Sequence, residues 1–140
     1  MAGSATNYLE TAVLGHTLAF SAYTKPGAVY VGLCTTAPTA AAAGTEVTGG
    51  GYVRRQATMA MDSGGRPDLA ANAVTIEWLP ATGTWGTVGW FELWDAATLG
   101  NRLYWGELVD PADFVTPITR TVLATDIMRL QAGALRVQAI

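Results

Sequence analysis

Hydrophobic and polar residues alternate along much of this chain with the period of two that half-buried β-strands produce. The clearest segment is residues 73–79, where Val74, Ile76 and Trp78 fall on one face and polar residues fall on the other. Segments of this kind are short and are separated by turn-forming residues. The pattern predicts strands at residues 28–35, 52–59, 73–79, 88–95, 102–108, 118–123, 127–130 and 135–139.

Helical periodicity occurs near the N-terminus, over residues 7–19. The residues that recur there at helical spacing are Leu9, Val13, His16 and Phe20. Asn7 is the expected N-cap, and Glu10 follows where a capping-box carboxylate belongs. We therefore expect one helix whose apolar side packs on its own domain or on a neighbour.

The order of the expected elements indicates an all-β fold. An α/β enzyme would alternate strands with helices, and that alternation is absent from the pattern. About eight short strands with regular turns and one N-terminal α-helix are typical of an antiparallel sandwich or barrel. The length suits a single domain over residues 1–140, with a helical segment at 1–22 and the β-sandwich at 28–140.

Glycine marks the expected turns. Gly100 and Asn101 join the fourth and fifth expected strands, and Ala132 and Gly133 form the turn of the last hairpin. These two hairpins fix the expected pairing of neighbouring strands.

Three consecutive glycines at residues 49–51 stand directly before Tyr52 and Val53. A phosphate-binding loop would need a following Lys-Ser or Lys-Thr and a helix N-terminus, whereas an expected strand follows here. Positive φ angles or close backbone packing explain the glycines better. We expect a flexible crossover that brings Tyr52 and Val53 into the second strand.

Half of the residues are hydrophobic and only 14% are charged, against about 25% charged in an ordinary soluble domain. The surface is therefore either largely neutral, as an alanine-rich composition would make it, or partly covered by partners. The net charge is −3 and the basic residues are scattered, so nucleic acid is not an expected partner. No run approaches the roughly 18 apolar residues of a membrane span, and the N-terminal region lacks the basic start of a signal peptide.

Residues able to carry catalysis or bind a metal are few. Cys34 is the single cysteine, which excludes an internal disulfide, and its apolar surroundings predict a buried side chain. His16 is the single histidine, and a packed, hydrogen-bonded role in the helix is favoured over a catalytic one. Glu92, Asp95 and Glu107 approach one another across the expected hairpin, and solvated charges explain them better than a calcium site or a glycosidase pair. We expect no catalytic residue, cofactor or metal.

Five tryptophans stand at positions 78, 85, 90, 94 and 105. Trp90 and Trp94 fall on one face of their strand, and Trp105 lies on the paired strand. Exposed rings in this arrangement would suit carbohydrate binding, whereas buried rings would anchor the core or an interface. The second role is favoured.

Several segments, taken together in order and spacing, resemble a family of small virion proteins of tailed bacteriophages. The segments are residues 7–16, 22–26, 29–35, 44–55, 84–88, 91–96 and 132–135. Members of that family are labelled tail fibre or structural proteins, and some resemble capsid cement proteins. The resemblance covers nearly the whole chain, implies a virion component and implies no catalytic residues.

On this resemblance we expect a capsid cement protein that lies on the outside of the head and bridges major capsid subunits. The fold expected for it is an all-β, jelly-roll-like antiparallel β-sandwich of about eight strands with one N-terminal α-helix. The chain would be made in the cytoplasm of the bacterial host and would pair with itself, as a homodimer rather than a trimer. The alternatives are a tail fibre or baseplate component that contacts host glycan through its tryptophans, and a small lectin-like or hydrolytic enzyme. The candidate interface residues are Tyr8, Leu9, Val13, Glu46, Tyr52, Arg54, Trp90, Trp94 and Trp105.

Overall fold

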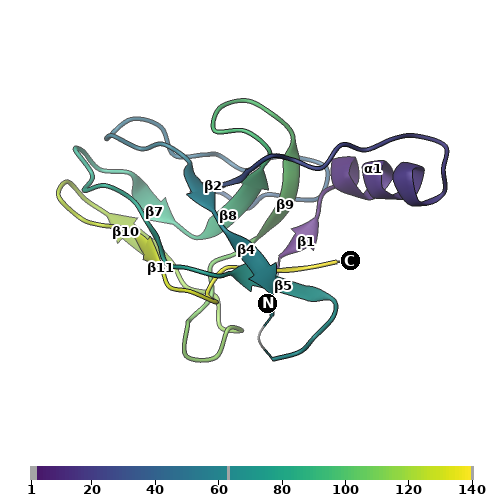
Figure 1. Cartoon of the computed structure of the whole chain (residues 1–140). Coiled ribbons are helices and arrows are strands. Elements are labelled where there is room, and N and C mark those ends of the chain that lie inside the picture. Colours follow the sequence, from purple (N-terminus) through teal and green to yellow (C-terminus); the bar gives the residue numbers. More distant parts are fainter. Residues whose placement is uncertain (1–2, 63, 140) are drawn as a thin grey trace.

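One helix and twelve short strands make up the computed structural model, which describes residues 3–62 and 64–139 (Figure 1). The helix, α1, spans Asn7–Thr17. The strands are β1 Ser4–Ala5, β2 Val29–Cys34, β3 Arg55–Ala57, β4 Met59–Met61, β5 Leu69–Asn72, β6 Ile76–Glu77, β7 Gly86–Val88, β8 Trp90–Trp94, β9 Arg102–Glu107, β10 Arg120–Val122, β11 Arg129–Leu130 and β12 Arg136–Gln138.

The two larger sheets join at both edges into a barrel-like ring. One sheet has the strand order β1-β9-β8-β2-β3, and the other has the order β12-β5-β4. Thr58 alone separates β3 from β4, so one extended segment serves both sheets. At the other edge, the Gly3 amide donates to the Arg136 carbonyl (2.8 Å) and the Gly3 carbonyl accepts from the Gln138 amide (2.8 Å). An added Cβ at Gly3 would lie 2.7 Å from the Trp105 carbonyl oxygen, so this joint requires glycine.

A two-stranded ribbon packs against this ring. It contains the antiparallel pairs β6–β11 and β7–β10. Between these pairs the hydrogen bonding continues, because the Trp78 amide donates to the Met128 carbonyl (3.0 Å) and the Trp85 amide donates to the Val122 carbonyl (2.8 Å). The ribbon therefore runs along one side of the molecule, at the left in Figure 1.

Ring and ribbon share one hydrophobic core. Trp78 and Trp85 are 2% and 5% exposed within it, which confirms a core role for these two tryptophans. Other members of this core include Val31, Leu33, Ile76, Val88, Phe91, Leu93, Met128, Leu130 and Leu135. A second, small cluster of Ala5, Leu9 and Leu103 holds α1 against the ring.

The all-β class and the N-terminal helix are confirmed, but the expected jelly-roll sandwich of about eight strands is not. The described residues form twelve strands in four sheets. The expected strand 52–59 starts only at Arg55 and breaks at Thr58, because its two halves belong to different sheets. The expected last hairpin is wrong: Gly133 turns the chain with a φ of 84°, but β11 pairs with β6 and β12 pairs with β5.

The hairpin of β8 and β9 is confirmed by pairs such as Leu93 with Tyr104. In contrast, β1 and β5 lie outside the expected strands. Their sequences, Ser-Ala and Leu-Ala-Ala-Asn, are poor in the β-branched and aromatic residues that favour strands. Pairing with strands that are distant in the sequence therefore determines that these two segments form strands.

The helix begins one residue away from the expected cap. Thr6 Oγ1 accepts the Leu9 amide (3.3 Å), so Thr6 is the N-cap and Asn7 opens the first turn. The helix ends at Thr17, and Ala19 turns the chain back with a φ of 64°. Across the described residues, no helix has the length and apolar character needed to cross a membrane.

Candidate functional site

The glycine-rich loop, residues 44–54, is hydrogen-bonded to the barrel and is not the flexible crossover that we expected. Gly49, Gly50 and Gly51 have φ angles of 75°, 58° and 76°, which confirms the expected positive values. Close packing also applies at Gly50, where an added Cβ would lie 2.8 Å from the Gly83 carbonyl oxygen. The glycines therefore serve backbone geometry.

Two core tryptophans hold this loop by their indole N–H groups. Trp85 Nε1 donates to the Gly50 carbonyl (2.8 Å), and Trp78 Nε1 donates to the Val53 carbonyl (2.9 Å). The Tyr52 ring meets the Trp85 ring edge to face, with centroids 5.3 Å apart. Tyr52 thus packs on the core ahead of β3, whereas the Val53 side chain is exposed, and the expected place of both residues in the second strand is wrong.

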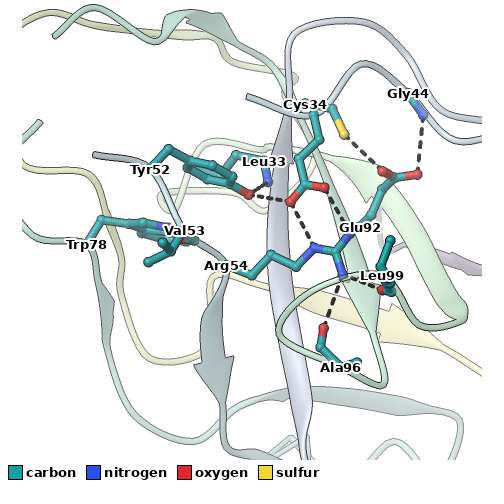
Figure 2. Close-up of polar contacts among 11 residues, drawn as sticks. Leu33, Cys34, Gly44, Tyr52, Val53, Arg54, Trp78, Glu92, Ala96 and Leu99 are labelled. Carbon is teal, nitrogen blue, oxygen red and sulfur yellow. Dashed lines mark hydrogen bonds and ion pairs between the residues drawn. The ribbon is translucent and has the colours of Figure 1, made fainter. Parts of the chain in front are cut away.

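An ion pair joins the two ends of the loop (Figure 2). Arg54 Nε and Nη2 donate to Glu46 Oε1 and Oε2, each at 2.9 Å. Arg54 Nη1 donates to the carbonyls of Ala96 (3.1 Å) and Leu99 (2.8 Å), in the turn between β8 and β9. The guanidinium carbon also lies 3.9 Å from the centroid of the Trp94 ring. With only 8% of its side chain exposed, Arg54 connects the loop, the turn and the sheet.

Tyr52 extends this ion pair to β2. Its hydroxyl donates to Glu46 Oε1 (2.8 Å) and accepts the Leu33 amide (2.8 Å). Burial, together with the charge of Glu46, raises the pKa of Tyr52 above its ordinary value. The hydroxyl therefore stays protonated and keeps its donor role.

A second paired carboxylate, Glu92, lies on the outer face of the five-stranded sheet and, unlike the half-buried Glu46, is fully buried. Its Oε1 accepts from Cys34 Sγ (3.1 Å), and its Oε2 accepts from the Gly44 amide (3.3 Å) and lies 3.1 Å from Arg102 Nη1. The expectation of a solvated charge is therefore wrong for Glu92. The loop folds back over this face of the sheet and covers the carboxylate (Figure 2).

These carboxylates are occupied by partners within the chain. Glu46 and Glu92 each face a guanidinium group, and Asp95 accepts the Asn101 amide (2.7 Å) within its own turn. Burial, and then the neighbouring Glu92, raises the pKa of the Cys34 thiol, which disfavours the reactive thiolate. The predicted burial of Cys34 is confirmed. Among the described residues, no group of three His, Cys, Asp or Glu side chains is placed to hold a metal ion.

The remaining tryptophans, Trp90, Trp94 and Trp105, are half-buried on β8 and β9. Arg54 covers the Trp94 ring, and the indole nitrogens of Trp94 and Trp105 are buried without a hydrogen-bond partner in the described part of the chain. A sugar-stacking platform needs open ring faces, so this geometry favours anchoring roles over carbohydrate binding.

The arm, residues 7–20, is attached to the barrel at its root and is otherwise exposed. Leu9 is 6% exposed and packs on Ala5 and Leu103 of its own chain. In Figure 1 the helix of the arm stands away from the strands, at the right. The large apolar side chains exposed on the arm are Tyr8, Val13, Leu14, Leu18 and Phe20.

Sequence reasoning placed Tyr8 and Val13 at an interface and put Phe20 on the apolar side of the helix, but it missed Leu14 and Leu18. The four-residue spacing of Leu14 and Leu18 was the available signal, because residues at i and i+4 share a helix face. His16 accepts the Tyr23 amide at Nδ1 (3.2 Å), which confirms its hydrogen bonding, but its side chain is exposed and the expected packing is wrong.

The predicted interface residues therefore separate into groups. The loop network brings together Glu46, Tyr52, Arg54 and Trp94. Tyr8, Leu9 and Val13 lie on α1, and only Leu9 among them is buried. Contact of any of these residues with a partner stays a prediction.

Comparison with known proteins identifies the family. Residues 4–138 match the family model described as Podophage GP4 fiber I protein gp80. The match spans nearly the whole chain, so the chain belongs to this family, and the resemblance to phage virion proteins is confirmed. No curated protein matches the chain. The protein is a structural component of a bacteriophage virion.

Proposed function

We propose that this member of a phage fibre family is a structural part of the tail fibre, held in the virion by its arm. The exposed apolar side chains that carry the proposal are Val13, Leu14, Leu18 and Phe20. Contiguous exposed apolar surface on a small protein marks a site of contact with another protein. The description of the family supports the fibre as its location.

The root of the arm is fixed, so the exposed surface is presented in a defined direction. The Thr6 amide donates to the Leu103 carbonyl (2.9 Å), and the Asn7 amide donates to the Ala40 carbonyl (3.0 Å). Leu9 adds apolar packing at the same point. A surface that is ordered before binding loses less conformational entropy on assembly, which favours contact with a neighbour.

A structural role rather than an enzymatic one is part of this proposal. It is supported by the loop network, where Glu46 and Glu92 are paired with arginines and the pKa of Cys34 is raised by burial. Groups in this state are poor general bases or nucleophiles.

A capsid cement protein is the second candidate. The observation that favours it is the compact barrel-like domain, whose sequence has no internal repeat of the kind that builds an extended shaft. Many copies that bind the assembled shell, but not its free subunits, would stabilise the shell by mass action. The partner would then be the major capsid protein.

The location in the virion tests both candidates. Gold-labelled antibody against this chain, applied to purified virions, marks the tail if the chain is a fibre part and the head surface if it is cement. Quantitative mass spectrometry supplies the copy number, which is low for a fibre part and approaches that of the major capsid protein for cement. Head labelling at high copy number would overturn the fibre assignment.

The role of the arm is tested by complementation of phage that lack this protein. The double variant Leu14→Ser and Leu18→Ser should enter virions about tenfold less, the equivalent of about 1.4 kcal/mol of contact free energy. Leu79→Ser is the matched control, because Leu79 is an exposed apolar residue (70%) outside the arm. Equal incorporation of the double variant and the control would contradict the role of the arm.

A further inference from the structure

A hollow opens on the side of the barrel away from the arm. It has a volume of about 250 Å³ and lies where β9, β10 and β11 meet. Its apolar lining includes Leu108, Ile118, Met128, Leu130 and Leu135. An apolar cavity of about 150 Å³ already accommodates benzene, so this hollow has room for one large apolar side chain.

The arm carries side chains of this kind at its end. Leu18 and Phe20 are 66% and 71% exposed. The arm lies at the right of Figure 1, whereas β10 and β11 lie at the left, so the arm of one molecule is remote from its own hollow. An occupant from this chain must therefore come from a second copy.

Charges around the two surfaces are complementary. The hollow is lined by one acid, Glu107, and by two bases, Arg120 and Arg129. Arg129 pairs with Glu77, whereas Glu107 and Arg120 form no ion pair within the described residues. The arm carries one acid, Glu10, and Lys25 follows in the segment directly after the arm; neither forms an ion pair in the part of the chain described by the structure. Opposite charges on two surfaces steer their encounter and fix their register.

We propose that the arm of one copy docks into the hollow of a second copy, with Phe20 entering the apolar space. Glu10 then faces Arg120, and Lys25 faces Glu107. The two surfaces differ, so the contact is heterologous and continues from copy to copy as a ring or an open filament. The homodimer that the sequence suggested would instead use the same surface on both copies.

This contact adds a self-assembly mode to the proposed function. It is tested on the purified chain alone, whereas the location in the virion is tested on phage particles. Failure of one therefore leaves the other standing.

The first test is sedimentation of the purified chain over a range of concentrations. The wild type should form species heavier than the 14.7 kDa monomer. Phe20→Ser and Arg120→Glu should each weaken association by about tenfold or more, since one removes the anchor and the other opposes like charges. Arg66→Glu, in an exposed loop, is the matched charge control and should associate like the wild type.

The decisive test mixes the two damaged variants. The Phe20→Ser chain keeps an intact hollow, and the Arg120→Glu chain keeps an intact arm, so a mixture should form a one-to-one heterodimer that grows no further. In addition, Glu10→Arg should restore association when it is combined with Arg120→Glu in one chain. Circular dichroism checks that each variant is folded.

The contrary results are equally definite. A wild type that stays monomeric at every concentration overturns the inference and assigns the arm to a different virion protein. Association that survives Phe20→Ser, or variant mixtures that stay monomeric, also overturns it.

Discussion

The glycine-rich loop and the arm differ in how they use their side chains. In the loop, Arg54 and Glu46 form a two-point ion pair, and two tryptophan N–H groups hold the backbone. In the arm, Leu9 alone among the large apolar side chains is buried. The loop has the more distinctive sequence, yet its interactions are internal, whereas the plainer helix offers surface to a partner.

The difference follows from the polarity of the two segments. Buried charges and backbone groups are costly unless they are paired, so the loop must find its partners within the barrel. Apolar side chains on the arm carry no such requirement, and they gain free energy whenever a neighbour removes them from water. A loop that looks like a binding site is therefore a scaffold here, and the arm is the candidate contact.

Thiol labelling should separate the two regions most strongly. At mildly alkaline pH, the raised pKa keeps the Cys34 thiol protonated in the native protein. Because this site opens only on global unfolding, Cys34 should react at least about 1,000-fold more slowly in the native protein than in the unfolded chain. A second thiol introduced by Val13→Cys should react at close to the unfolded rate. Rapid labelling of Cys34 in the native protein would contradict the burial of this region.

Removal of one buried charge should have the next largest effect. Glu92→Ala leaves Arg102 without its buried partner and should lower the free energy of unfolding by about 3–5 kcal/mol. The control is Glu77→Ala, which breaks an exposed pair with Arg129 and should cost about 0–1 kcal/mol. Urea unfolding curves give both free energies, and equal losses would show that burial does not make the pair of Glu92 with Arg102 more important for stability than the exposed pair.

Substitution of single glycines in the loop should have a smaller effect on the free energy of unfolding. Gly50→Ala should cost about 2–3 kcal/mol, because a positive φ is strained for alanine and the Cβ overlaps the Gly83 carbonyl. Gly49→Ala has the same kind of φ but open space, so it should cost only about 1 kcal/mol. Thermal denaturation compares the two, and the account fails if Gly49→Ala is the more harmful change.

The arm variants should have the smallest effect on stability. Leu14→Ser and Leu18→Ser should each change the free energy of unfolding by no more than about 0.5 kcal/mol, because both side chains already lie in water. Leu9→Ala on the same helix should cost about 2–5 kcal/mol, because Leu9 is buried. Destabilisation by Leu14→Ser as large as that by Leu9→Ala would show that the arm packs internally.

Local pattern was enough to predict part of this structure. Alternation predicted β2 and the β8–β9 hairpin, and helical spacing predicted α1. The three glycines predicted positive φ angles because few other residues adopt them. The family resemblance rested on whole segments and needed no structure.

The rest depends on contacts between distant residues. No local signal indicates that Gly3 closes the ring or that the strand after Tyr52 changes sheets at Thr58. Glu92 sits in an alternating strand like any solvated charge, and only the returning loop, through Gly44 and Arg102, makes it buried. The register of strand pairing and the way in which a loop folds back over a sheet depend on contacts between distant residues, which the pattern of residues along the chain does not encode.

Hydrogen–deuterium exchange, compared between the free chain and the chain assembled in virions, tests the central claim most directly. The account predicts that amides of residues 8–20 exchange more slowly in the assembled chain than in the free chain. Amides of residues 46–57 should be protected to the same degree in both states. An arm that exchanges equally fast in the virion, with new protection appearing in the glycine-rich loop instead, would contradict the account.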